Sequence, residues 1–177
     1  MTRFVATPRD AVEGVALNPR GVAADEGNVA TDLLTGLPDR AAWDEGLPAL
    51  LDGAGRERIP VCVALLEIDG FAEFVAARGA VHGDRLLKEC AAAWRSRLRD
   101  GDLLARYADD QFAIALTGCG EREATGLLER MVAMAPRGRT CAVGVAGWEA
   151  GERAPRLIAR AEAALVVARH GDARHAA

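Results

Sequence analysis

The fold class is decided by the stretch Leu103-Leu104-Ala105-Arg106-Tyr107-Ala108-Asp109-Asp110-Gln111-Phe112-Ala113-Ile114-Ala115-Leu116. Two short apolar runs flank the segment 108–111, and this spacing is typical of a β-hairpin with polar residues at its tip. A parallel doubly wound sheet would contain no such hairpin at its centre. The pattern therefore favours a mixed sheet of α+β class, with helices on one side.

Apolar periodicity on both sides of the hairpin predicts the other elements. Upstream we expect a helix of about a dozen residues that ends before Gly53, a strand over the apolar run 61–66, a short helix over 71–77 and a longer one from Asp84. Downstream, a helix over 124–132, a strand over 140–148 and a helix from Leu157 follow. The expected order is helix, strand, helix, helix, strand, strand, helix, strand, helix.

Composition indicates a globular chain with one domain. Half of the 177 residues are apolar and 27% are charged, while residues 1–30 carry turn formers without a period and predict a flexible leader before a domain over 31–177. The net charge of −4 argues against DNA, RNA or an anionic membrane as a partner. The four cysteines include no C-x-x-C pair, so we expect no zinc site. The sequence has no long apolar segment, and we expect a cytoplasmic protein.

Carboxylates gather where the predicted strands end. Asp69 closes the apolar strand, and Asp109 and Asp110 lie at the hairpin tip. If the tip lies beside that strand end, the acids converge, and paired acids of this kind hold Mg²⁺ together with the phosphate oxygens of a nucleotide. Asp also suits turns and strand ends because it bonds its own backbone, so a purely structural role stays open.

Six segments resemble the motifs of GGDEF domains, the diguanylate cyclase family, in family order and spacing over about residues 32–172. They are Asp32-Leu33-Leu34-Thr35-Gly36-Leu37-Pro38-Asp39-Arg40, Asp69-Gly70-Phe71, Gly79 to Asp84, Arg106 to Phe112, Val143 to Ala146 and Ala161 to Leu165. The resemblance implies a palm-like fold with a mainly antiparallel mixed sheet. It also implies a reaction in which two domains each present one GTP with Mg²⁺ to form cyclic di-GMP, and hence a homodimer.

The resemblance assigns roles at the nucleotide site. It implies that Asp69 and Asp110 bind Mg²⁺, that Asp84 recognises guanine, and that Arg169 contacts phosphate where the family has lysine. Asp109 would lie beside the substrate triphosphate.

The resemblance also implies an inhibitory R-x-x-D site for cyclic di-GMP at Arg99 and Asp102. A guanidinium can bind phosphate or a guanine edge bidentately, and a carboxylate can accept from guanine N–H groups. R-x-x-D occurs four times in the chain, so only its distance from the hairpin distinguishes the copy that begins at Arg99. The alternative interpretation is that these residues form a solvated helix end.

The signature segment reads Ala108-Asp109-Asp110-Gln111-Phe112 and departs from the family pattern. Asp109 replaces a glycine, and two like charges 4 Å apart repel by about 4 kcal/mol at an effective dielectric of 20. Gln111 replaces the catalytic glutamate and can neither take up a proton nor offer a charged metal ligand, while Val75 replaces the asparagine used for guanine. These departures predict a degenerate, catalytically inactive domain.

Three functions stay open from the sequence. The leading one is a receptor for cyclic di-GMP or GTP, or a regulator of a protein partner in trans. The second is a weakly active diguanylate cyclase, or another nucleotide-polymerising or cyclising enzyme, with Mg²⁺ at Asp69 and Asp110. The third is an interaction module that binds no nucleotide.

Overall fold

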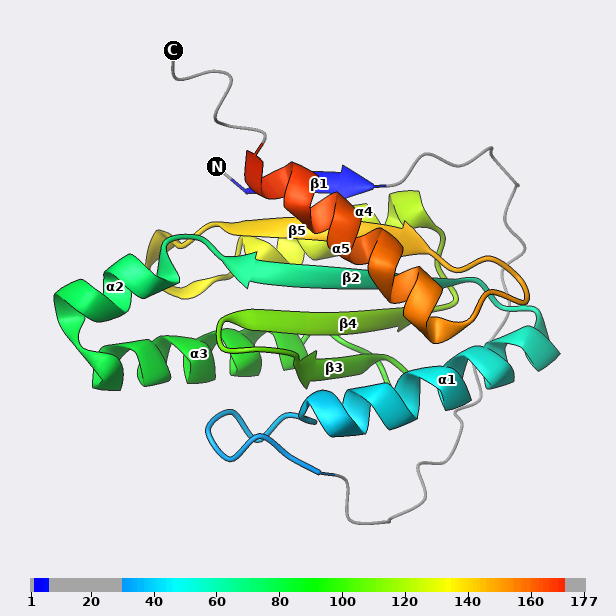
Figure 1. Cartoon of the computed structure of the whole chain (residues 1–177), viewed down its shortest axis with the longest axis horizontal. Coiled ribbons are helices and arrows are strands. Elements are labelled where there is room, and N and C mark those ends of the chain that lie inside the picture. Colours follow the sequence, from blue (N-terminus) through cyan, green and yellow to red (C-terminus); the bar gives the residue numbers. More distant parts are fainter. Residues whose placement is uncertain (1, 7–29, 171–177) are drawn as a thin grey trace.

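The computed structural model describes residues 2–6 and 30–170, in which one sheet lies between two layers of helices (Figure 1). The α+β class and the predicted order of elements are confirmed, with one additional strand at the start of the chain. The elements are β1 (Arg3–Ala6), α1 (Arg40–Glu57), β2 (Val61–Ile68), α2 (Phe71–Arg78), α3 (Ala80–Arg95), β3 (Leu103–Arg106), β4 (Gln111–Thr117), α4 (Glu121–Val132), the 3₁₀ turn η1 (Pro136–Gly138), β5 (Cys141–Gly147) and α5 (Ala154–His170).

The sheet has the strand order β1-β5-β2-β4-β3 and is antiparallel except where β1 runs parallel to β5. The predicted hairpin is confirmed, since β3 pairs with β4 from Leu103 opposite Ala115 to Arg106 opposite Phe112. Because β2 lies between β4 and β5 in the antiparallel sense, its last residues lie beside the hairpin tip. The topology therefore brings two distant parts of the chain to one end of the sheet.

Helices cover both faces of the sheet, so the prediction that they lie on one side is wrong. Ala64 and Leu66 of β2 belong to a core with α3 and α4, whereas Val63 and Leu65 belong to a second core with α1 and α5. The physical reason is the continuous apolar run of β2. A strand that is apolar at every position must be covered on both faces.

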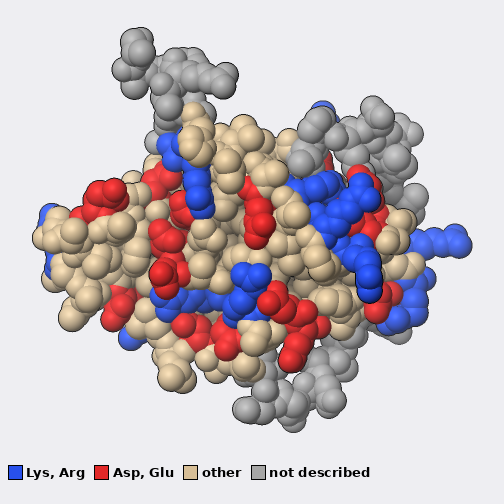
Figure 2. Space-filling model, viewed as in Figure 1, with Lys and Arg blue, Asp and Glu red and all other residues tan. Residues whose placement is uncertain are grey.

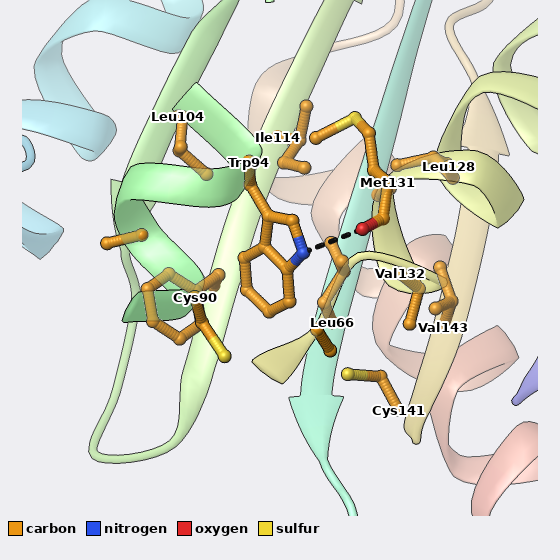
Figure 3. Packing of buried hydrophobic residues seen from close by; sticks show 14 of the residues in the cluster. Leu66, Cys90, Trp94, Leu104, Ile114, Leu128, Met131, Val132, Cys141 and Val143 are labelled. Carbon is orange, nitrogen blue, oxygen red and sulfur yellow. Dashed lines mark hydrogen bonds between the residues drawn. The ribbon is translucent and has the colours of Figure 1, made fainter. Parts of the chain in front are cut away.

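Trp94 connects two helices behind the sheet. Its indole N–H donates to the Met131 backbone oxygen at 3.0 Å (Figure 3). Its ring also meets Phe112 edge to face, with 4.9 Å between the ring centroids. Carbonyl groups in the last turn of a helix have no partner within that helix. Trp94 donates a hydrogen bond to such a carbonyl group of α4 and so fixes α3 against α4.

Gly144 lets α5 pass close over β5. A Cβ at this position would lie 2.2 Å from the backbone oxygen of Ala161 and 2.2 Å from the backbone nitrogen of Leu165. No side chain can be accommodated at such distances without moving the helix. The glycine therefore sets the distance between α5 and the sheet.

Several element boundaries differ from the predicted ones. Residues 3–6 form β1 where we expected a flexible leader. The described residues do not include 7–29, which are the rest of that leader, or 171–177, which end the predicted domain. α1 continues past Gly53 to Glu57 because Gly53 is buried and Gly55 lies against Trp148, so these glycines serve packing instead of ending the helix. α3 begins at Ala80, before Asp84. In the described part of the chain, no helix is long and apolar enough to cross a membrane.

Candidate functional site

The end of β2 lies beside the start of β4, which is the condition under which the sequence predicted that the acids converge. Glu67 is directly opposite Gln111, and the Ile68 N–H donates to the Asp110 backbone oxygen at 3.3 Å. Asp69 follows β2 and Asp110 precedes β4, so both candidate metal ligands lie at this end of the sheet. We call this region the β2 end.

Both carboxylate oxygens of Asp69 already have donors. Arg3 of β1 forms an ion pair with its Oδ1 at 2.7 Å, and the Thr140 hydroxyl donates to its Oδ2 at 2.5 Å. The Arg3 and Asp69 side chains are each 24% exposed. The Arg3 guanidinium of the first strand is therefore paired with Asp69, the acid that the family resemblance predicts to bind a metal.

Glu67 is the central residue of the β2 end that the sequence analysis missed. Its Oε2 accepts from Gln111 Nε2 at 2.6 Å and is also paired with Arg169 of α5. The signal was present in the sequence, because Glu67 is the single charged residue of β2, and a charge in a buried strand needs a partner. Gln111 and Arg169, both predicted at the nucleotide site, thus contact a side chain of the protein itself.

The residues of the β2 end do not fit a resident Mg²⁺ in this arrangement. Mg²⁺ prefers carboxylate oxygens at 2.0–2.1 Å, but each oxygen of Asp69 has a hydrogen-bond donor. Burial, and after it the negative charge of Glu67, raise the pKa of Asp110. Within residues 2–6 and 30–170, no three or more His, Cys, Asp or Glu side chains gather as metal ligands would.

The other residues predicted at the nucleotide site lie apart from this network. Asp84 is exposed on α3, and the Asp109 side chain is exposed at the hairpin tip. The Asp109 backbone oxygen accepts from Arg106 at 2.8 Å, and Arg106 also pairs with Asp32 at 3.0 Å. Asp32 and Arg106 belong to two of the family-like motifs, and their ion pair ties the segment before α1 to the hairpin.

Asp32 has a perturbed pKa with a definite cause. Burial alone would raise the pKa, but hydrogen bonds from the Thr35 hydroxyl and backbone N–H, together with the Arg106 guanidinium, bring it below its ordinary value. The carboxylate form is therefore stabilised by folding.

A hollow of about 290 Å³ opens at the opposite end of β4, where the sequence predicted the R-x-x-D site. It is lined by Arg99, Asp102, Leu116, Thr117, Gly118, Cys119, Glu123, Leu127 and Arg130. The Asp102 Oδ2 accepts from the Arg99 backbone N–H at 3.0 Å, and its Oδ1 accepts from the backbone N–H of Thr117 at 3.0 Å. Asp102 therefore fixes the turn before β3 against the end of β4.

The two arginines of this hollow form no ion pair with any residue that the structure describes, although Asp102 and Glu123 also line it. The guanidinium groups of Arg99 and Arg130 have no hydrogen-bond or ion-pair partner among the residues that the structure describes. Glu123, by contrast, accepts from the Gly120 N–H at 3.1 Å within the capping of α4. The hollow thus offers two unpaired guanidiniums, which is the donor set for an anion.

Charges of both signs are intermixed on the face that carries α5 and α1. Figure 2 shows acidic and basic side chains side by side across this face, in keeping with the many arginine–carboxylate pairs. A broad surface of one sign, as expected for binding duplex nucleic acid, is not seen on it.

Comparison with known proteins identifies the family. The family model described as "Diguanylate cyclase, GGDEF domain" matches residues 29–175. Diguanylate cyclase DgcP of Pseudomonas aeruginosa is 33% identical over 145 residues, which are 76% of this chain and 22% of that protein. Cyclic di-GMP phosphodiesterase NbdA of the same species is 34% identical over 101 residues, 57% of this chain and 13% of that protein.

Solved structures agree with the sequence relatives. The GGDEF domain of DgcB from Caulobacter crescentus, in complex with c-di-GMP, has a TM-score of 0.76 at 25% identity, with 84% of this chain and 94% of that chain covered. Diguanylate cyclase SiaD of Pseudomonas aeruginosa, in complex with its activator SiaC, has a TM-score of 0.75 at 30% identity, with 80% and 58% covered. The chain spans less than a quarter of the curated relatives named above. From residues 29 to 175 the chain belongs to the GGDEF family.

Proposed function

We propose that this GGDEF domain is a cytoplasmic, non-catalytic receptor for cyclic di-GMP that binds the ligand in the hollow at Arg99, Asp102 and Arg130 and regulates a protein partner in trans. The observation that carries the proposal is the pair of guanidiniums, in a hollow of about 290 Å³, that have no hydrogen-bond or ion-pair partner within the described part of the chain.

The chemistry of the hollow suits a cyclic dinucleotide. A guanidinium binds phosphate oxygens bidentately, and two phosphodiester anions would find two such groups here. An ionised carboxylate has about four acceptor positions, of which Asp102 uses three, on Arg99 N–H, Thr117 N–H and the Thr117 hydroxyl. One position is left for a guanine N–H. The volume lies at the lower end of ligand pockets, so part of the ligand would remain outside.

The contacts of the β2 end favour a non-catalytic domain. Gln111 cannot exchange a proton, and its amide is held by Glu67 at 2.6 Å. Arg169 is paired with Glu67, and Asp69 is paired with Arg3. A GTP–Mg²⁺ complex would have to displace both arginines before any reaction.

The relatives support the classes of ligand and partner. DgcB is described in complex with c-di-GMP, and SiaD in complex with a protein activator. Since this chain is a member of the same family, we extend both classes of interaction to it as parts of the proposal.

Calorimetric titration with cyclic di-GMP tests the receptor. Wild type should bind, and Arg99→Ala and Arg130→Ala should each weaken binding about tenfold or more, because each removes a charged hydrogen bond worth about 1.5–3 kcal/mol. Arg97→Ala is the matched control, since Arg97 begins an R-x-x-D sequence two residues earlier but does not line the hollow. Folded wild type that gives no heat would leave the interaction module as the better reading.

A residual cyclase is the second candidate, because Asp69 and Asp110 do lie at one end of the sheet. Incubation with GTP and Mg²⁺ or Mn²⁺ should give no cyclic di-GMP. Product that disappears in Asp69→Asn would establish the enzyme and refute the non-catalytic proposal.

A further inference from the structure

Two cysteines that lie 57 residues apart in the sequence contact each other near the end of β4. We propose that Cys62 and Cys119 are a redox-sensitive pair that closes into a reversible disulfide when a hydroperoxide oxidises Cys119. This inference goes beyond the receptor proposal and does not rest on it, because the reaction needs no nucleotide.

The backbone holds the two cysteines together. Cys62 is the second residue of β2, and Cys119 lies between β4 and α4. The Gly118 N–H donates to the Pro60 backbone oxygen at 2.8 Å, and the Cys62 thiol donates to the Cys119 backbone oxygen at 3.5 Å. Both side chains pack in the same core, on the sheet face that α3 and α4 cover. A disulfide forms without backbone movement only between cysteines that are held close together, and these contacts keep the pair close.

The two thiols differ in their access to solvent. Cys119 is partly exposed and lines the hollow, whereas Cys62 is 2% exposed. An oxidant therefore reaches Cys119 through the hollow and does not reach Cys62 directly. Redox-sensing cysteines are accessible and lie next to a second cysteine that resolves the first oxidation product, which is the arrangement found here.

The surroundings of Cys119 favour its thiolate, which is the reactive form of a cysteine. The hydrogen bond with the Cys62 thiol has the largest effect and lowers the pKa of Cys119, and the Arg99 guanidinium acts in the same direction. Burial and the carboxylates of Asp102 and Glu123 act against this, but the pKa of Cys119 stays below its ordinary value.

Cys90 and Cys141 provide the contrast within the same core. Both are buried among hydrophobic residues (Figure 3). Burial raises the pKa of Cys90 to about 12, and it raises the pKa of Cys141 as well. Their thiols therefore stay protonated and inert. Cys119 is the one cysteine of the four that is not buried.

The reaction balances with hydrogen peroxide as the oxidant. The Cys119 thiolate attacks one peroxide oxygen, the O–O bond breaks, and the leaving hydroxide takes up the proton that the thiol gave up, which yields water and a sulfenic acid on Cys119. The Cys62 sulfur then attacks the Cys119 sulfur: the S–S bond forms, the S–O bond breaks, and the Cys62 proton leaves with the hydroxide as a second water. The two thiols together lose two electrons, and the peroxide gains them. In a cytoplasmic protein, as we propose this one to be, such disulfides are usually transient and redox-sensing.

Peptide mapping of the full chain after treatment with hydrogen peroxide tests the pair. Trypsin cleaves after Arg and Lys and places each cysteine on a different peptide, with Cys62 on residues 59–78 and Cys119 on residues 107–122. Without reductant these two peptides should be joined, and dithiothreitol should separate them. Oxidised protein in which the two peptides stay separate, or in which another pair is joined in their place, overturns the proposal.

Two variants assign the steps, and a third is the matched control. Cys62→Ala should stop at a sulfenic acid on Cys119, which dimedone traps, and Cys119→Ala should leave Cys62 unmodified. Cys90→Ala removes a buried cysteine of the same core and should form the disulfide as wild type does. A sulfenic acid on Cys62 in Cys119→Ala, or no disulfide in folded Cys90→Ala, would contradict the proposal.

Alkylation of reduced wild type gives a measurement that needs no variant. At pH 7, iodoacetamide should modify Cys119 about tenfold faster, or more, than Cys90 and Cys141, because Cys119 is exposed and has the lower pKa. Equal rates at the three cysteines would refute the reactivity assigned to Cys119. No nucleotide enters these experiments, so the cysteine pair and the receptor proposal fail separately.

Discussion

Replacing Gln111 by the glutamate of the family signature should destabilise this protein and should not restore catalysis. In the structure the Gln111 amide donates to Glu67 Oε2 at 2.6 Å, so Gln111→Glu converts a charge-assisted hydrogen bond into a contact between two carboxylates. Losing a hydrogen bond to a charged group costs about 1.5–3 kcal/mol. Two like charges 4 Å apart add about 4 kcal/mol at an effective dielectric of 20.

Arg169 offsets part of this repulsion because it is paired with the same Glu67 oxygen. We therefore expect a net loss of about 2–4 kcal/mol near pH 8, equivalent to a decrease in melting temperature of roughly 4–16 °C for a domain of this size. The repulsion raises the pKa of one of the two carboxyls in the folded state. The unfolded state then binds fewer protons, so the stability of the variant falls as pH rises from about 4 through that raised pKa.

Urea unfolding of wild type and Gln111→Glu at pH 4.5 and pH 8 measures the effect. The exchanged pair Glu67→Gln/Gln111→Glu is the control, because it restores one amide and one carboxylate at the same positions and should recover most of the stability at pH 8. The Gln111–Glu67 contact would be refuted if Gln111→Glu were as stable as wild type at both pH values. It would also be refuted if the exchanged pair were no more stable than Gln111→Glu.

Two further predictions concern the packing of α5 and the segment before α1. Gly144→Ala should lower the unfolding free energy by at least about 3 kcal/mol, because the new Cβ would lie 2.2 Å from the Leu165 backbone nitrogen. Gly126→Ala in α4 is the control: its Cβ would lie 3.7 Å from an arginine side chain, so this change should be neutral or stabilising. Asp32→Asn should reduce stability at pH 7, and the effect should shrink as the pH falls through the lowered pKa of Asp32, because the carboxylate stabilises the fold only while it is ionised. Urea unfolding over a series of pH values would disprove this if the loss were the same in acid as at pH 7.

The hairpin and the buried strand could be predicted because their patterns are local. β2 is a continuous apolar run and the hairpin has a polar tip between two apolar runs, so both appear in a short window of sequence. β1 could not be found in this way. It has four residues without alternation, and its partner β5 lies more than 130 residues downstream, so only tertiary pairing reveals it.

The candidate site was predictable in position but not in its contacts. The sequence places Asp69 at a strand end and Asp110 at a hairpin tip, and the antiparallel pairing of β2 with β4 in the structure brings both to one end of the sheet. The partner of Asp69 depends on β1, and the partner of Gln111 depends on Glu67, which no motif marks. Register across strands, and not the motif itself, decides which charges meet.

The pairing of charges distinguishes the two ends of β4. At the β2 end Arg3 is paired with Asp69 and Arg169 with Glu67, so an incoming anion meets two neutralised cations there. In the hollow the carboxylates are held by backbone N–H groups, while the guanidiniums of Arg99 and Arg130 have no partner in residues 2–6 and 30–170. An anionic ligand gains most where it replaces water around an unpaired cation and breaks no existing ion pair. On this balance of charges, we expect the proposed cyclic dinucleotide ligand to bind in the hollow and not at the β2 end.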